Sequence, residues 1–442
     1  MRLTILGGGG FRVPLIHQAL LRDTGPGRVT ELTLHDVDAG RLAAIARVLR
    51  DQAFVGGGPV RITLTTDLDE ALTGTDFVFS AIRVGGLGGR AIDERVALDE
   101  GVLGQETVGP GGVSFALRTL PVAIDVARRV AAVAPQAWVI NFTNPAGLVT
   151  EAMSAHLGDR VIGICDSPVG LGRRVARVLG LDPARAHFDY AGLNHLGWLR
   201  GVHVDGVDHL PRLLSDMDAL GSFEEGKLFG ADWLRVLGAV PNEYLHYYYF
   251  TREAVTAGRA SETRGAFLQR QQEQFYAGLA RDTDGALTAW RRTRSEREAT
   301  YMADTREGER DALDIGSGGY EEVALALMRA IAHDERTTLI LNVRNRSALS
   351  ILDDSAVVEV PCVVDARGAR PLPVDPLSEH MAGLVCGVKA VERAAIEAAV
   401  SGSRAAALRA LAIHPLVDSV TVARRILDGY VQRLPQLSYL RA

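Results

Sequence analysis

The amino-terminal stretch Met1-Arg-Leu-Thr-Ile-Leu-Gly-Gly-Gly-Gly-Phe-Arg12 decides the fold. An apolar strand, Leu3 to Leu6, runs into four glycines, a helix-like segment follows, and a second strand ends at Asp36. Glycine lets the backbone turn sharply and approach a pyrophosphate, whose charge then lies on free N–H groups at a helix N-terminus. An acidic residue closing the second strand binds the ribose hydroxyls of NAD and repels the extra phosphate of NADP. The order predicts a NAD-binding domain.

The spelling departs from the strict G-x-G-x-x-G fingerprint, because Phe11 and Arg12 stand where the last glycine would lie. A glycine-rich turn in some other α/β protein is the alternative interpretation. On the dinucleotide interpretation, the predicted cofactor-binding residues in this region are Gly7, Gly8, Gly9, Phe11, Arg12 and Asp36.

The composition limits the classes of protein to which the chain can belong. With 442 residues the chain exceeds the usual size of a single core, so two domains are expected, at 1–192 and 193–442. Hydrophobic residues make up 47% and charged residues 23%, which is typical of a soluble globular enzyme. The net charge is −6 and the arginines are scattered among acidic residues, which argues against nucleic acid as a partner. Three cysteines and the absence of a signal peptide or membrane-length apolar run predict a cytoplasmic protein with no membrane partner.

The first 165 residues alternate strand-like and helix-like segments, which is the pattern of a parallel sheet with crossover helices. After about Leu193 the periodicity changes to long polar helical stretches, then to further strands and an Ala-rich helical region from Glu379 to Gln432, interrupted at Pro415. We therefore expect a Rossmann-type α/β domain followed by an α+β domain for substrate binding and oligomerisation. The expected strands are Leu3–Leu6, Thr30–His35, Ile62–Thr65, Phe77–Ile82, Trp138–Asn141, Val161–Ile164, Thr338–Val343 and Ala356–Val364, and the expected helices include Val113–Val133, one starting at Asn144-Pro145, Glu262–Leu279 and Gly285–Ala299.

Cys165 ends a predicted strand, at the edge of a parallel sheet where such folds bind ligands, and His195 follows thirty residues later. A thiolate and an imidazole with open positions for substrate oxygens would suit Mn²⁺, Fe²⁺, Co²⁺ or Ni²⁺ in a catalytic role. A buried, inert cysteine and a hydrogen-bonded histidine are the alternative.

Two arginines flank the glycine-rich stretch Gly85–Gly89. A guanidinium there suits oxyanions or sugar hydroxyls, although Arg83 and Arg90 could equally be solvated surface groups. Asn141 and Asn144 follow another strand and are candidates for cofactor ribose or substrate hydroxyls, with helix capping by Asn144 as the alternative.

Tyr244 lies in the aromatic cluster Pro241-Asn-Glu-Tyr-Leu-His-Tyr-Tyr-Tyr-Phe250, and most such tyrosines serve packing. A tyrosine close to a metal and an arginine could instead act as a base, because nearby positive charge favours the phenolate.

Together these motifs resemble glycoside hydrolase family 4, the NAD- and metal-dependent 6-phospho-glycosidases, and the similarity is greatest to 6-phospho-β-glucosidases. The family has a dehydrogenase-like fold of the lactate/malate type and is typically dimeric or tetrameric. The matching pieces are Gly7–Gly10, Ile82–Gly86 with Arg90, Asp93-Glu94, Gly104–Thr107, Gly109–Gly112, Asn141–Ala146, Cys165-Asp166, Gly192–His195, Tyr244–Tyr248, Leu341–Asn345 and Val358–Cys362.

The resemblance implies that a glycoside is hydrolysed through temporary oxidation, an exception to the two-carboxylate mechanism of glycosidases. NAD⁺ takes hydride from C3 of the sugar, a base removes the acidified C2 proton, the aglycone leaves from C1, water adds, and the hydride returns. By the same resemblance Cys165 and His195 hold the metal, expected to be Mn²⁺, with Tyr244 as the base and Asp166 as the acid for the leaving group. The implied cofactor contacts extend to Arg83 and Asn141, and the implied substrate contacts are Arg90, Asn144 and Arg264.

One stretch departs from the family. Many 6-phospho-β-glucosidases have Lys-Arg-Gly-Gly before a tyrosine where this chain reads Asp314-Ile-Gly-Ser-Gly-Gly-Tyr320, so an arginine expected near the substrate phosphate is missing. A family member acting on a non-phosphorylated sugar is therefore one alternative. A plain 2-hydroxy-acid dehydrogenase of the lactate/malate type is the second, and a silent NAD-binding regulator is the third.

Overall fold

The structure is a computed structural model that describes residues 1–55, 60–281, 285–300 and 319–441. One half of its sheet is parallel. Six strands run in the order β3-β2-β1-β4-β5-β6, which is the doubly wound order of dinucleotide-binding folds. Their bounds are β1 Arg2–Leu6, β2 Glu31–His35, β3 Arg61–Thr65, β4 Phe77–Ser80, β5 Trp138–Asn141 and β6 Val161–Gly163.

The other half of the sheet is antiparallel and continues from β6 without a break. Strand β11 pairs with β6 at Asn342 opposite Gly163, and β12, β7, β8 and β10 follow in that order. β13 pairs with β12, and β9 pairs with β8. The bounds are β7 His187–Leu193, β8 Leu196–Val204, β9 Val207–Asp208, β10 Val240–Pro241, β11 Thr337–Arg344, β12 Val357–Asp365 and β13 Gly368–Pro371.

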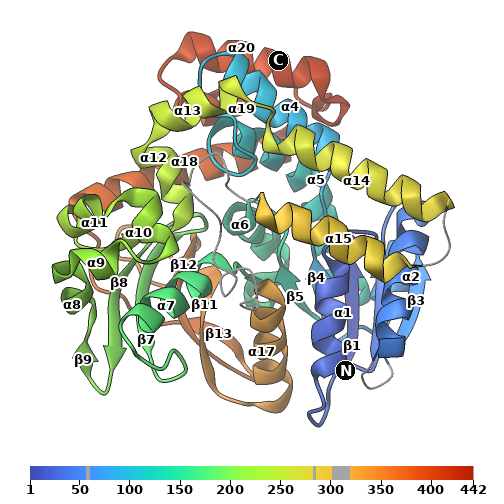
Figure 1. Ribbon diagram of the computed structural model, residues 1–442. Helices are drawn as coiled ribbons and strands as arrows, with labels where there is room; N and C mark the ends of the chain where they lie inside the picture. The colour runs from blue at the N-terminus through green and yellow to red at the C-terminus, as the bar shows by residue number, and fades with distance from the viewer. Residues whose placement is uncertain (56–59, 282–284, 301–318, 442) are drawn as a thin grey trace.

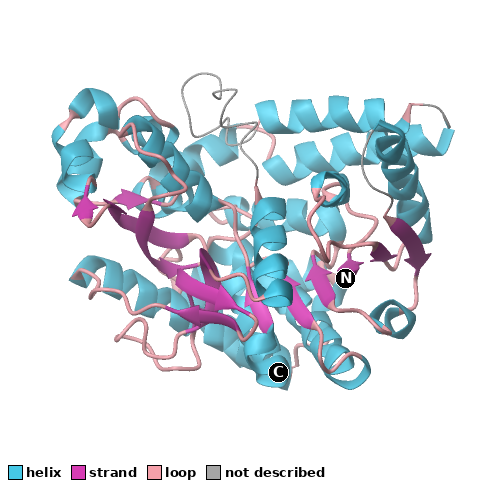
Figure 2. Ribbon diagram, turned by 90° about the horizontal axis from the view of Figure 1, so that it is seen from below, coloured by secondary structure: helices cyan, strands magenta, loops and turns pink. Residues whose placement is uncertain are grey.

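Helices cover both faces of this sheet, as the views in Figures 1 and 2 show. The crossover helices of the parallel half are α1 Val13–Arg22, α2 Ala39–Val55, α3 Leu68–Leu72, α4 Gly86–Asp99, α5 Gly109–Val133, α6 Ala146–Leu157 and α7 Ser167–Val178. The later helices are α8 Leu210–Ser215, α9 Met217–Leu220, α10 Glu224–Phe229, α11 Ala231–Leu237, α12 His246–Tyr249, α13 Thr251–Ala260, α14 Arg264–Arg281, α15 Ala286–Ala299, α17 Tyr320–His333, α18 Glu379–Ser401, α19 Arg404–Ala412 and α20 Val420–Arg433. Short 3₁₀ turns are η1 Gly158–Arg160, η2 Glu243–Leu245 and η3 Pro435–Leu437.

The predicted α/β fold is confirmed, and the eight expected strands form within one or two residues at each end. Three details differ. The helix expected from Val113 begins at Gly109, because Pro110 occupies its first turn, where a missing N–H costs nothing. The helical region from Glu379 breaks at Gly402 as well as near Pro415, and Gly402 takes a left-handed φ of +73° at the end of α18. The β7–β8 hairpin was not predicted, because its strands lack a clean alternation of polar and apolar residues.

The domain division predicted between residues 192 and 193 falls at the end of β7, inside the continuous sheet. It stays a prediction. Among the described residues, no helix combines the length and apolarity needed to cross a lipid bilayer.

Candidate active site

A cavity of about 1170 Å³ opens at the carboxyl ends of the parallel strands. The loops after β1 and β2 form one side of it, and the loop after β6, the β7–β8 turn, η2 and α14 to α15 form the other. The two sides meet at α15, where the guanidinium carbon of Arg297 lies 5.9 Å from the centre of the Phe11 ring. This edge of a doubly wound sheet is where such folds bind ligands. We refer to the two sides as the nucleotide wall and the catalytic wall.

The glycine turn at the nucleotide wall is closed by hydrogen bonds to β2. The N–H groups of Gly7 and Gly8 both donate to the carbonyl oxygen of His35, at 2.9 and 2.7 Å, and Gly9 N–H donates to Asp36 Oδ2 at 3.0 Å. A side chain at Gly7 would place its Cβ 2.5 Å from the Ala81 oxygen, so only glycine fits there. Gly7 and Asp36 line the cavity, whereas Gly8 and Gly9 lie in the turn behind it.

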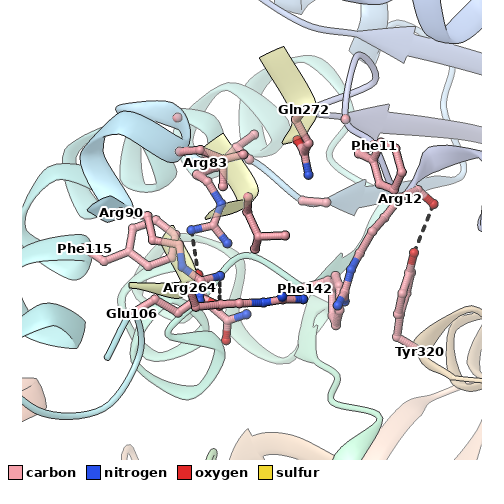
Figure 3. A pocket seen from close by; sticks show the side chains of 18 of the residues that line it. Phe11, Arg12, Arg83, Arg90, Glu106, Phe115, Phe142, Arg264, Gln272 and Tyr320 are labelled. Carbon is pink, nitrogen blue, oxygen red and sulfur yellow. Dashed lines mark hydrogen bonds and ion pairs between the residues drawn. The ribbon is translucent and has the colours of Figure 1, made fainter. Parts of the chain in front are cut away.

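Arg12, which precedes helix α1, lies beside a stacked pair of aromatic rings, Phe142 and Tyr320, whose centres are 4.2 Å apart. Its guanidinium carbon is 5.7 Å from the centre of the Phe142 ring and 5.4 Å from that of Tyr320, and the Tyr320 hydroxyl donates to the Arg12 carbonyl oxygen at 3.0 Å. Figure 3 shows this group on one side of the cavity, across from Arg83, Arg90 and Glu106. Phe11, the neighbouring residue, lines the same space, and its carbonyl oxygen accepts from the Trp290 indole at 2.8 Å.

Cys165 and His195 line the same cavity. Residue 195 sits in the β7–β8 turn with a φ of +62°, and Thr107 Oγ1 lies 3.0 Å from its Nδ1. Because this contact occupies Nδ1, the other ring nitrogen, Nε2, is left for a ligand. Metal-binding histidines commonly use their second ring nitrogen for such a hydrogen bond. Burial lowers the pKa of His195 to about 3, so the ring is neutral and able to coordinate. Burial, with Glu359 and Asp166 nearby, raises the pKa of the Cys165 thiol.

No group of three or more His, Cys, Asp and Glu side chains gathers for a metal in the part of the chain that the structure describes. The thiol of Cys165 and the neutral imidazole of His195 line one cavity, and such a donor pair suits a catalytic cation that keeps open positions for other ligands.

Tyr244 stacks on His195. Their ring centres are 3.6 Å apart and the planes differ by 8°, and the Tyr244 backbone N–H donates to Asn242 Oδ1 at 3.1 Å. Arg90 is also close. Burial opposes the charge on Arg90, but Glu106, Glu94 and Tyr244 raise its pKa overall. The phenol thus lies beside a permanent positive charge, which favours its ionised form.

Glu106, which the sequence interpretation did not single out, joins the two predicted arginines. It forms ion pairs of 2.8 Å with both Arg83 and Arg90. Burial alone would raise its pKa, but Arg90 and Arg83 hold the pKa of Glu106 down to about 2. Arg90 also donates to Glu94 at 2.7 Å, and the other Glu94 oxygen accepts from the Gly265 N–H at 2.6 Å, which anchors the start of α14.

A second group of arginines gathers where α15 meets the cavity. Arg264 donates to the Arg297 carbonyl oxygen at 2.7 Å and to Thr300 Oγ1 at 2.6 Å. Arg297 is half-buried in the cavity wall and forms no ion pair with a carboxylate within the described ranges. Burial and the neighbouring Arg12, Arg264 and Arg90 lower its pKa well below the usual value. Guanidinium groups gathered in this way favour the binding of an anion.

Of the remaining predicted residues, two line the cavity and one does not. Asn144 and Asp166 line the cavity, and Asp166, at the start of α7, does not cap that helix with its side chain. Asn141 lies away from the cavity: its fully buried amide donates to the Thr143 and Ala146 oxygens and to Thr150 Oγ1. These internal hydrogen bonds hold the loop after β5, and the predicted contact of Asn141 with the cofactor stays a prediction.

The structure brings twelve of the fifteen predicted residues to one cavity, because only Gly8, Gly9 and Asn141 are absent from its lining. Sequence reasoning missed Glu106 although it lies in Gly104–Thr107, one of the pieces that match the family. Arg297 carries no signal at all, because α15 is rich in Arg and Glu throughout. The departure at Asp314–Tyr320 lies outside the described residues except for its last two positions.

The fold and this site define an enzyme built on the dinucleotide-binding fold, with a cavity suited to an anionic substrate rich in oxygen. A model described as "Family 4 glycosyl hydrolase" matches residues 2–181, and the "Family 4 glycosyl hydrolase C-terminal domain" matches residues 190–417. The chain therefore belongs to family 4 of the glycosyl hydrolases.

Relatives match over the whole chain. A "Probable 6-phospho-beta-glucosidase" of Bacillus subtilis is 33% identical, over 98% of this chain and 96% of the relative, and a 6-phospho-alpha-glucosidase of Leptotrichia buccalis is 31% identical, over 97% of each. The structure of the 6-phospho-beta glucosidase from Thermotoga maritima with manganese, NAD⁺ and glucose-6-phosphate matches with a TM-score of 0.82 and 25% identity, over 100% of both chains. A malate dehydrogenase from Plasmodium falciparum shares the fold alone, with a TM-score of 0.50 and 13% identity over 91% of this chain and 99% of that one.

Proposed function

We propose that this protein hydrolyses the O-glycosidic bond of a 6-phosphorylated glucoside by NAD-dependent temporary oxidation of the sugar. The observation that carries the proposal is the single cavity in which a dinucleotide turn faces Cys165, His195 and Tyr244. Membership of family 4 favours this hydrolysis over a 2-hydroxy-acid dehydrogenase, which needs neither the thiol nor the tyrosine.

The residues present fit both cofactors. Asp36 is placed to accept from ribose hydroxyls, Gly7, Phe11, Arg12 and Arg83 line the path of the nucleotide, and Cys165 with His195 would hold Mn²⁺. When bound, NAD supplies a reversible hydride acceptor and the cation supplies Lewis acidity for charge on the sugar oxygens.

The protein's own groups then move the protons. Tyr244 removes the proton from C2, helped by the positive Arg90 next to its ring. Asp166 protonates the departing oxygen at C1, since its carboxyl faces the cavity and is not used as a helix cap. The stacked His195 ring restricts the phenol to one orientation, which fixes the face of the sugar from which the proton leaves.

The arginines of the catalytic wall support a phosphorylated substrate. In this proposal Arg90, Asn144 and Arg264 bind the sugar and its phosphate, and Arg297 adds positive charge for which the described residues offer no ion pair with a carboxylate. A phosphate dianion would satisfy these groups through charge-assisted hydrogen bonds. The guanidinium of Arg297 thereby stands in for the arginine missing from the 314–320 stretch.

A panel of p-nitrophenyl α- and β-glycosides, each with and without a 6-phosphate, tests the proposal with NAD⁺, Mn²⁺ and a reductant present. We expect turnover of a 6-phosphoglucoside that depends on NAD⁺ but produces no net NADH. Stoichiometric NADH from a hydroxy acid would identify a dehydrogenase instead. Turnover of only the non-phosphorylated sugars would remove the phosphate from the proposal.

We also propose that the chain works as a homodimer or homotetramer in the cytoplasm, with residues 193–442 forming the substrate-binding and oligomerisation domain. The three cysteines are all free, as expected in a reducing compartment. Sedimentation of the purified protein tests the assembly.

A further inference from the structure

A row of polar side chains crosses the junction between the two halves of the sheet. In register, Gly163 of β6 pairs with Asn342 of β11, Asn342 pairs with Glu359 of β12, and Glu359 pairs with Gly192 of β7. Gly163 lies two residues before Cys165, and Gly192 lies three before His195. The row therefore starts and ends within three residues of the two proposed metal ligands.

Glu359 is the centre of this row. Its carboxylate is fully buried, and both oxygens accept hydrogen bonds: Oε1 from Asn342 Nδ2 at 2.8 Å and Asn194 Nδ2 at 3.2 Å, and Oε2 from the Tyr190 hydroxyl at 3.1 Å. A buried carboxylate without an ion pair is costly unless its lone pairs are satisfied, and here three donors satisfy them.

One arm of this network leads to His195. Asn194, which donates to Glu359, is its immediate neighbour, and Asn194 Oδ1 accepts from the Ala146 N–H at 3.1 Å. In this turn the backbone of His195 is left-handed. The hydrogen bonds of Asn194, the preceding residue, hold the turn in place. Without the clamp, the φ of +62° at a non-glycine residue would be free to relax.

The other arm leads to Tyr244. The Tyr190 hydroxyl that donates to Glu359 accepts from Asn242 Nδ2 at 3.3 Å, and Asn242 Oδ1 accepts from the backbone N–H of Tyr244 at 3.1 Å. Asn242 and Tyr190 are both fully buried. The two side chains between Glu359 and Tyr244 are therefore shielded from solvent, which keeps this series of hydrogen bonds fixed.

We infer that Glu359 is a positioning residue that holds the His195 turn and the Tyr244 segment in one fixed relation, through Asn194 on one side and through Tyr190 and Asn242 on the other. Because a base displaced by about 1 Å loses about a hundredfold in rate, this carboxylate sets the geometry of the reaction without touching the sugar. The inference rests on the proposed function, which assigns the cation to His195 and the base to Tyr244.

Three substitutions separate the arms. Asn194→Ala cuts only the first arm, so Mn²⁺ affinity is expected to fall about 10- to 100-fold, the range for second-shell partners of metal ligands. Tyr190→Phe cuts only the second arm, so kcat is expected to fall about tenfold or more while Mn²⁺ affinity stays within about twofold. Glu359→Gln keeps an amide oxygen for the two asparagines but presents a donor to the tyrosine hydroxyl, so it is expected to behave like Tyr190→Phe.

Mn²⁺ affinity is measured by calorimetry on the full-length protein saturated with NAD, and kcat is measured at saturating Mn²⁺. Glu392→Gln is the matched control, because Glu392 is a buried carboxylate held by Lys389, which joins α18 to Glu151 of α6 and to the Val357 carbonyl oxygen of β12 and makes no hydrogen bond to Glu359 or its partners. We expect that control to lower the unfolding temperature and to leave Mn²⁺ affinity and kcat unchanged.

The inference is overturned if Asn194→Ala, Tyr190→Phe and Glu359→Gln lower only the unfolding temperature, as the control does, with affinity and kcat within twofold of the parent. If Glu359→Gln does not fold, the two single-arm variants decide the matter. A parent protein that binds Mn²⁺ but turns over no glycoside refutes the proposed function, and the calorimetric arm still tests Asn194.

Discussion

The nucleotide wall and the catalytic wall of the cavity are built in different ways. The first is made by the consecutive loops after β1 and β2, and the hydrogen bonds that close its glycine turn join residues fewer than thirty positions apart, such as Gly9 and Asp36. The second gathers Cys165, His195, Tyr244 and Arg297 from four separate segments. The nucleotide wall is what a dehydrogenase of the same fold also needs, so the catalytic wall decides the reaction.

The largest expected effect breaks the catalytic wall alone. Cys165→Ser should reduce turnover of the 6-phosphoglucoside by more than about a thousandfold, because the thiolate that would hold the cation is gone, while NAD affinity stays unchanged. Cys386→Ser is the control, since Cys386 is exposed on α18 and outside the cavity lining. Calorimetry with NAD and a steady-state assay measure the two quantities. Full activity of the Cys165 variant would remove the metal from the mechanism.

Tyr244→Phe should cost about a hundred- to a thousandfold in kcat, the range for loss of a positioned base. The stack on His195 needs only the ring, so Mn²⁺ affinity should be retained. Hydrolysis in D₂O by the parent should place deuterium at C2 of the product, and the variant should slow that exchange in step with kcat. Tyr248→Phe, in the same aromatic cluster, serves as the control. Product from the parent without label at C2 would exclude the elimination route.

A third substitution, at Arg297, distinguishes binding of the substrate phosphate from binding of the nucleotide. Arg297→Met should lower kcat/KM for the phosphorylated substrate by about 10- to 100-fold, which corresponds to ~1.5–3 kcal/mol for a hydrogen bond to a charged group. The activity on the non-phosphorylated glucoside should hardly change. Arg291→Met, an exposed position of the same helix, is the matched control. A fall in NAD affinity with unchanged phosphate preference would assign Arg297 to the nucleotide wall.

The same contrast explains how much could be predicted from sequence. The nucleotide wall was predictable because strand, glycine turn and Asp36 follow one another locally, and the structure returns them as β1, the turn and β2. On the catalytic wall, Cys165, His195 and Tyr244 were found through their resemblance to a family. Nothing local in the chain says that these three share a cavity, because long-range strand pairing brings them together.

Residues whose role depends on charge balance could not be predicted from the sequence, for a physical reason. Glu106 is significant because two arginines converge on it, and Arg297 because, among the described residues, it forms no ion pair with a carboxylate. Both properties belong to three-dimensional neighbours rather than to sequence spacing. Asn141 shows the reverse case: it ends β5 at a ligand-binding edge, but in the structure its amide donates three internal hydrogen bonds.

The smallest expected effect lies on the nucleotide wall. Asp36→Ala should weaken NAD about tenfold, or ~1.4 kcal/mol, and reduce discrimination against NADP. The carboxylate has two roles here, because it accepts from the Gly9 and Asp38 N–H groups as well as facing the cavity. Its loss therefore loosens the glycine turn and removes the negative charge that repels a 2′-phosphate.

Dissociation constants for NAD and NADP, measured side by side, separate these two roles. Loosening of the turn alone would weaken both nucleotides equally, whereas loss of the repulsion shifts their ratio toward NADP. Glu31→Ala is the control, since Glu31 begins the same strand at its opposite end, paired with Arg61 on the surface. An unchanged ratio would place Asp36 away from the ribose, and the preference for NAD would then have to come from the catalytic wall.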